Sequence, residues 1–145
     1  MAARDPRVLP QNIEAEQAIL GSMLVSTAAC ETAVEILEDS DFYRKEHRII
    51  FDVLKSMIVR DVPIDTITVQ EELRKRGELE QVGALDYLLT LVDSVALGDN
   101  VEYYADIVAD KSTLRKLITA GTEIVAMAYD QEEEVRDIPE TPEIL

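Results

Sequence analysis

Cysteine is almost absent from this sequence, and that scarcity limits how the chain can be stabilised. Cys30 is the single cysteine among 145 residues, so no internal disulfide can form. Chains without disulfides are typical of reducing compartments. The first residues, MAARDPRVLPQNIEAEQ, contain no apolar signal core, and no apolar run approaches the roughly 18 residues that cross a bilayer. We therefore expect a cytoplasmic protein with no membrane segment.

Glycine is also scarce, and the chain has few groups that could support catalysis. The five glycines stand alone, so neither the phosphate-binding pattern GxxxxGK[ST] nor the dinucleotide pattern GxGxxG occurs. His47 is the only histidine and Cys30 the only other soft ligand, too few for a zinc site. We expect His47 to be an ordinary partly buried or surface residue of a helix. No catalytic, cofactor-binding or metal-binding residue is predicted.

Positive charge is in deficit as well. Fourteen lysines and arginines stand against 30 acidic residues, giving a formal net charge of −16. Long-range repulsion opposes an encounter with DNA, RNA or an anionic membrane, so we expect little or no direct DNA binding. A basic partner protein fits better. Acidic pairs such as Glu71–Glu72 and Asp39–Asp41 are expected by chance in so acidic a chain, and we predict that they lie on solvated faces.

Apolar residues recur at helical spacing along most of the chain, and no long alternating pattern predicts a sheet. We therefore predict an all-α fold with a compact head of about five helices, followed by a long projecting helix. The boundaries are an extended arm at 1–11, the head at 12–99, the long helix at 100–130 and an acidic tail containing prolines at 131–145. The head helices are expected near 12–26, 28–38, 45–59, 68–77 and 83–95. Asn12 is expected to cap the first, and Thr68 with Glu71 to form a capping box at the fourth.

The last predicted helix is too long for the head. Thirty residues of helix span roughly 45 Å, whereas a 100-residue domain has a radius of gyration near ~13 Å. We expect its first half to pack on the head and its second half to project. The alternative is a separate helix that begins at Ser112–Thr113 and folds back. The residues expected to pack on the head are Tyr103, Tyr104, Ile107 and Val108.

The second half of this helix carries an apolar stripe. Either the stripe packs on the head as ordinary core, or it is a surface for a partner, since large exposed apolar patches usually mark interaction. The sequence leaves both possibilities open. The stripe includes Leu114, Leu117, Ile118, Ile124 and Val125.

Four stretches in succession resemble one protein family. They are LPQNIEAEQAILGSML, DFYRKEHRIIF, DVPIDTITVQEELRKRGELEQVGALDYLLTL and NVEYYADIVADKSTLRKLI. In order and spacing they look like the N-terminal domain of bacterial DnaB-type replicative DNA helicases, over roughly residues 7–130. Four linked motifs are far more specific than any one alone.

The resemblance implies a helical head followed by a helical hairpin, of which the long helix is the first arm. In the family these domains form a collar on a ring-shaped hexamer, so we expect a homo-oligomer between a dimer and a hexameric ring. The collar docks the C-terminal domain of primase, and helicase loaders can also engage the helicase. The motor that uses ATP and Mg²⁺ lies C-terminal to the collar, so neither is expected to bind this chain.

The resemblance also yields candidate contact residues. Those for hairpin pairing or primase docking are Leu114, Leu117, Ile118, Ile124 and Val125. Tyr87 is a further candidate, because an aromatic near the junction of head and arm suits an interface hot spot. A core tyrosine is the alternative.

The sequence departs from the family after Asp130, where Pro139 and Pro142 oppose a second long helix. Two other functions stay open. One is the helicase-interacting C-terminal domain of a primase, which has a similar fold, although NIEAEQAILGSML near the start favours the helicase. The other is a small acidic metal-dependent hydrolase.

Overall fold

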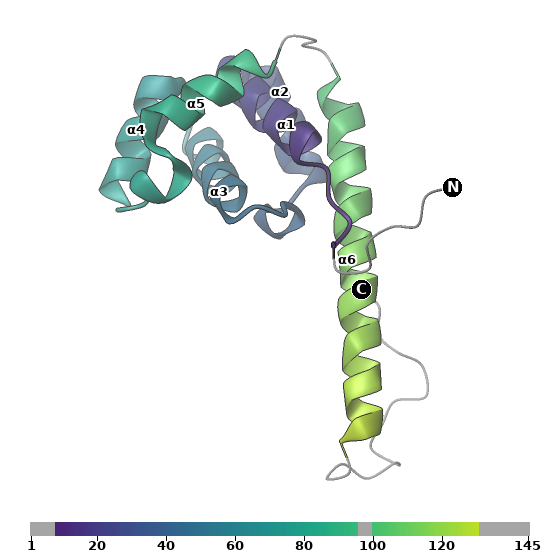
Figure 1. Cartoon of the computed structure of the whole chain (residues 1–145). Coiled ribbons are helices and arrows are strands. Elements are labelled where there is room, and N and C mark those ends of the chain that lie inside the picture. Colours follow the sequence, from purple (N-terminus) through teal and green to yellow (C-terminus); the bar gives the residue numbers. More distant parts are fainter. Residues whose placement is uncertain (1–7, 96–99, 131–145) are drawn as a thin grey trace.

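A computed structural model describes residues 8–95 and 100–130 of the chain. These residues form a helical head from which one long helix projects, as Figure 1 shows, and they contain no strand. The prediction of an all-α head with a projecting helix is confirmed. The six α-helices are α1 (Ile13–Val25), α2 (Thr27–Ile36), α3 (Lys45–Val59), α4 (Thr66–Lys75), α5 (Ala84–Asp93) and α6 (Val101–Tyr129).

Helix α1 is the centre of the head, in contact with α2, α3, α5 and α6. Gly21 makes the approach to α5 possible, because a Cβ at this position would collide with the carbonyl oxygen of Leu91. Inside the head, Phe42, which precedes α3, packs on Phe51 of α3 with ring centroids 4.9 Å apart. The largest fully buried side chains come from α1, α3, α4, α5 and the segments next to them: Ile19, Leu20, Met23, Leu37, Phe42, Ile50, Phe51, Leu54, Met57, Leu73, Leu88 and Leu91.

Short polar side chains set the helix boundaries. Asn12 caps α1 by accepting the N–H of Ala15 at 2.9 Å, as its type and position predict. Ser26 ends α1 and also caps α2, accepting the N–H of Ala29 at 3.2 Å. Because this one residue serves both helices, α1 and α2 follow each other with no loop between them.

The predicted N-cap of α4 is wrong by three residues, nearly one turn. Asp65 is the N-cap, and its carboxylate accepts the N–H of Thr68 at 2.8 Å while the Thr68 hydroxyl accepts the N–H of Asp65 at 2.9 Å. Thr68 is therefore the third residue of a capping box, not its first. Glu71 instead bonds to Arg74, a hydrogen bond that lowers the pKa of the Glu71 carboxyl below its ordinary value.

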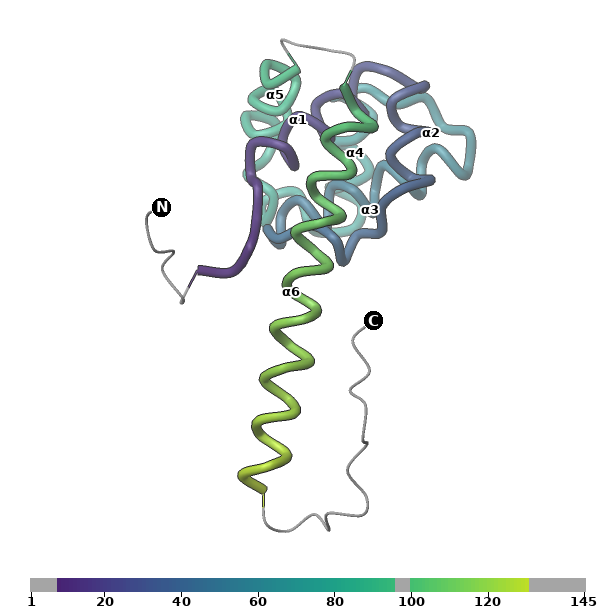
Figure 2. Tube along the Cα trace, turned by 90° about the vertical axis from the view of Figure 1, so that its right-hand side faces the viewer, coloured from purple at the N-terminus to yellow at the C-terminus, as the bar shows by residue number. Residues whose placement is uncertain are grey.

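Helix α6 is continuous, so the alternative break at Ser112–Thr113 does not occur. Its first half packs on α1 and α2, and its second half extends away from the head in both views (Figures 1 and 2). Tyr103 was expected to face the head but is 68% exposed. The buried residues of α6 are Val101, Ala105, Val108 and Ser112.

Candidate protein-interaction surface

The second half of α6 carries an uncovered apolar stripe. We use arm stripe for Leu114, Leu117, Ile118, Ile124 and Val125, whose side chains are 40–55% exposed. Counting about 100° per residue, Leu114 lies roughly 200° around the axis from the buried Ser112. The arm stripe therefore faces away from the side of α6 that packs on the head. Of the two possibilities left open by the sequence, ordinary core packing against helices α1–α5 does not occur.

A polar cluster fixes the root of the arm. The Ser112 hydroxyl donates to the Asp41 carboxylate at 2.8 Å, both groups being buried. One turn further along, Arg115 donates to the carbonyl oxygens of Asp41 at 2.6 Å and Pro10 at 2.8 Å. Its guanidinium also lies over the ring of Tyr43. The direction of the arm relative to the head is thus set by charge-assisted hydrogen bonds to two distant segments.

Asp41 does not lie on a solvated face, contrary to the prediction. Its second carboxylate oxygen accepts the N–H of Glu38 at 2.8 Å, which closes the short turn before α3. The sequence could not indicate this role, because Ser112 is 71 residues away.

Tyr87 lies on α5 in the head, so the structure does not bring it into one patch with the arm stripe. The side chain is half-buried, and its hydroxyl points inward. That hydroxyl is 2.6 Å from Nε2 of His47 and accepts a hydrogen bond from Nε2 of Gln17 at 3.2 Å. Tyr87 is therefore partly a core tyrosine, and part of its side chain remains accessible.

His47 is fully buried, not a partly buried or surface residue as expected. Its Nδ1 is 2.7 Å from Oε1 of Glu16, a carboxylate that is itself 1% exposed. Glu16 also accepts the N–H of Tyr43 at 2.8 Å, at the start of α3. The cluster joins α1, α3 and α5, and sequence reasoning missed it because the partners of His47 are 31 and 40 residues away.

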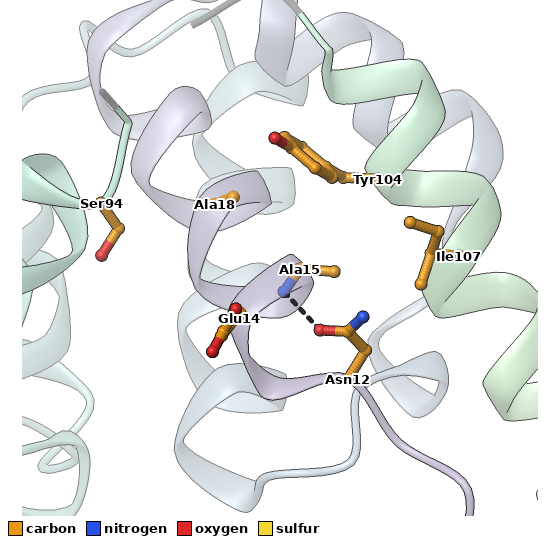
Figure 3. A pocket seen from close by; sticks show the side chains of 7 residues that line it. All are labelled: Asn12, Glu14, Ala15, Ala18, Ser94, Tyr104 and Ile107. Atoms are coloured by element: carbon orange, nitrogen blue, oxygen red, sulfur yellow. Dashed lines mark hydrogen bonds between the residues drawn. The ribbon is translucent and has the colours of Figure 1, made fainter. Parts of the chain in front are cut away.

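A hollow of about 230 Å³ lies between α1, the end of α5 and α6, and Figure 3 shows its lining. The Asn12 side chain at its edge is already used to cap α1. Among the described residues that line the hollow, Glu14 supplies the only carboxylate, and none carries a basic side chain. The lining residues are Asn12, Glu14, Ala15, Ala18, Ser94, Tyr104 and Ile107.

The remaining reactive groups do not form a site. Cys30 is buried, and burial, helped by the nearby Glu31 carboxylate, raises the pKa of its thiol to about 11. Within residues 8–95 and 100–130, no three His, Cys, Asp or Glu side chains are placed to hold a metal ion. The hydrolase alternative is therefore not favoured. Nor does any helix in the described part of the chain have the length and apolarity to cross a membrane.

Comparison with known proteins places the chain among helicase domains. The sequence profile of the family described as DnaB-like helicase N terminal domain matches residues 8–110. The replicative DNA helicase DnaB of Leifsonia xyli subsp. xyli is 44% identical over 132 residues, which cover 91% of this chain but only 29% of that relative. The chain thus spans less than a third of this relative's length.

Two solved structures extend the comparison. The crystal structure of the N-terminal domain of DnaB helicase from Mycobacterium tuberculosis matches with a TM-score of 0.86 and 39% identity, over 90% of this chain and 92% of that one. A structure of a DnaB-like replicative helicase and its interactions with primase matches with a TM-score of 0.68 and 27% identity, over 81% of this chain and 28% of that one. These matches favour the helicase over the primase domain.

Proposed function

Because this chain belongs to the DnaB-like helicase N-terminal domain family, we propose that it is the non-catalytic N-terminal domain of a replicative DNA helicase. In this role it joins helicase subunits into a dimer or a hexameric ring and docks the C-terminal domain of primase, in the cytoplasm. Helicase loaders are a further class of partner. Nucleotide hydrolysis, with ATP and Mg²⁺, belongs to a separate motor domain of the parent protein.

The observation that carries the proposal is the arm stripe. Five large apolar side chains lie on the side of α6 that faces away from the head, each at least 40% exposed. Burying apolar surface contributes roughly 25 cal/mol per Å², so a helix that covers the stripe gains free energy that the isolated head does not provide. A protein partner is the occupant that such a surface fits.

The two candidate surfaces take different roles in this proposal. The arm stripe pairs with a neighbouring copy or a primase helix, in a contact that is largely apolar. Tyr87 offers a partly exposed aromatic ring on the head, a residue type enriched at interface hot spots. A structure of a related DnaB-like helicase is described with its interactions with primase, which supports a primase as a partner of this domain.

A titration of the 145-residue chain with the cognate primase C-terminal domain tests docking. We expect saturable binding, and a loss of at least about tenfold in affinity for Ile118→Asp, because a buried unpaired carboxylate is costly in an apolar contact. Thr119→Asp is the matched control, since Thr119 is exposed and points away from the arm stripe. Equal affinities for the two variants would argue against the arm stripe as the docking surface.

Light scattering across a concentration series tests assembly separately. If neighbouring copies cover the arm stripe, the apparent mass rises with concentration for the parent chain and for Thr119→Asp. Ile118→Asp stays monomeric over the same range. A parent chain that remains monomeric at every concentration would count against self-assembly by this domain, and would leave primase as the occupant.

A further inference from the structure

The buried cluster of Glu16, His47 and Tyr87 lies outside the arm stripe. It joins three helices through short contacts, 2.7 Å between Glu16 and Nδ1 of His47 and 2.6 Å between Nε2 of His47 and the Tyr87 hydroxyl. The rings of His47 and Tyr87 are nearly parallel, 11° apart. Glu16 and His47 are fully buried, whereas Tyr87 is half-buried, so the cluster reaches from the core to the surface.

The positions of the protons follow from the partners. The Glu16 carboxylate accepts the N–H groups of Tyr43 at 2.8 Å and Arg44 at 3.5 Å, so it is surrounded by donors and its third contact, Nδ1 of His47, must also donate. In a neutral imidazole the other nitrogen, Nε2, then accepts. Among the described residues, the donor in contact with Nε2 is the Tyr87 O–H, 2.6 Å away.

This arrangement gives both ring nitrogens of His47 and the Tyr87 oxygen a partner. The Tyr87 oxygen accepts from Gln17 at 3.2 Å while its own hydrogen goes to His47. Throughout the described part of the chain, no buried side-chain nitrogen or oxygen lacks a hydrogen-bond partner. The cluster is therefore directional, from Tyr87 to His47 to Glu16.

We propose that His47, oriented by Glu16, is a positioning residue that holds the Tyr87 ring in the orientation in which it contacts the protein partner. The inference rests on the proposed function, in which Tyr87 belongs to a docking surface. A tyrosine that is held before binding loses little side-chain freedom on binding. Releasing it weakens binding roughly two- to tenfold, the cost of immobilising one mobile side chain.

Two substitutions of His47 separate positioning from stability. The amide of asparagine reaches the place of Nδ1, beside Glu16, whereas the longer glutamine places its amide at Nε2, beside Tyr87. Each variant loses one of two buried hydrogen bonds, so we expect both to unfold at lower denaturant concentration. If His47 positions Tyr87, only His47→Asn weakens primase binding, and His47→Gln binds as tightly as the parent chain.

Tyr87→Phe provides the matching change on the other side of the contact. It removes the hydroxyl and keeps the ring, so it should weaken primase binding by the same factor as His47→Asn. The double variant should bind no more weakly than either single variant, because both changes break one hydrogen bond. Additive losses would overturn the inference.

NMR of the chain with labelled tyrosine can follow the exchange of the Tyr87 hydroxyl proton with water. This measurement needs no partner protein. We expect slow exchange of this proton with water in the parent chain and in His47→Gln, and its loss in His47→Asn. Persistence in His47→Asn overturns the positioning role. If the proton is lost but His47→Asn binds primase like the parent chain, the link to docking is overturned and the proposed function stands. A parent chain that does not bind primase overturns primase docking itself.

Discussion

At the scale of single residues, Gly21 shows how little room the head leaves between two helices. A Cβ at this position would meet the carbonyl oxygen of Leu91 and the side chain of Val95. Helix backbones cannot yield without moving α5, so Gly21→Ala should destabilise the fold by about 1–3 kcal/mol. Urea unfolding measures the change. An unchanged unfolding midpoint would mean that α1 and α5 are not in close contact.

Cys30 permits a prediction from its raised pKa. With a pKa of about 11, the thiol is almost entirely protonated at pH 8, so alkylation of the folded chain should be slow and should accelerate on addition of denaturant. The same shift affects stability. The folded state holds the proton more tightly than the unfolded state, so the contribution of this thiol to stability is fully present below about pH 9 and is lost as the pH rises through about 11. Fast alkylation of the folded chain at pH 8 would contradict the burial.

Four residues show which features of single side chains could be predicted from the sequence and which could not. The identity of Asn12 predicted its capping role because the bond is local, three residues along the chain. The burial of His47 and Asp41 depended on partners more than 30 residues away, and a charged or polar residue is buried only where such partners exist. Tyr103 is exposed because α6 is rotated so that Val101, Ala105 and Val108 face the head instead.

At the scale of elements, helix α6 contains a glycine, Gly121, that no close packing contact requires. Gly121 is exposed, and a Cβ on it would meet no atom within 4 Å. Because glycine costs roughly 0.5–1 kcal/mol relative to alanine inside a helix, Gly121→Ala should stabilise the arm, the opposite of the change at Gly21. Amide hydrogen exchange along 114–128 should slow by a corresponding factor. Faster exchange would mean that the arm is not a regular helix at this point.

The root of the arm depends on the Ser112–Asp41 hydrogen bond. Ser112→Ala removes a buried donor to a carboxylate, and we expect a loss of about 1–3 kcal/mol in the free energy of unfolding. Thr113→Ala is the control, since Thr113 is exposed and its hydroxyl bonds only to the carbonyl of Ala109 within the same helix. Denaturant unfolding of both variants measures the two changes in the free energy of unfolding. Equal losses would mean that the Ser112–Asp41 hydrogen bond does not stabilise the root of the arm.

Helix existence was easier to predict than helix boundaries. The apolar period predicted α3 as 45–59, its observed span, because Ile50, Leu54 and Met57 mark one buried face. The start of α4 was misplaced because Asp65 and Thr68 are both good capping residues, and local sequence does not choose between them. The predictions for residues 1–7, 96–99 and 131–145, including the acidic tail, lie outside the described residues.

At the scale of the whole molecule, apolar side chains lie in two places, the core of the head and the arm stripe. The head buries its core around α1, whereas α6 turns a second apolar surface away from the head. The sequence predicted this stripe from its period. Its exposure required the structure, since the same period also describes a helix that folds back. Our central claim is that another protein covers the arm stripe.

Amide hydrogen exchange of the arm, with and without a partner, tests that claim most directly. In a dilute solution of the chain without a partner, amides between Leu114 and Ala128 should exchange faster than those of α1 and α3, because the arm lacks tertiary packing. Addition of the primase C-terminal domain, or self-association at high concentration, should slow exchange in this segment by the largest factor in the molecule. Slowing confined to the head, with exchange along the arm unchanged when a partner is bound, would contradict the account.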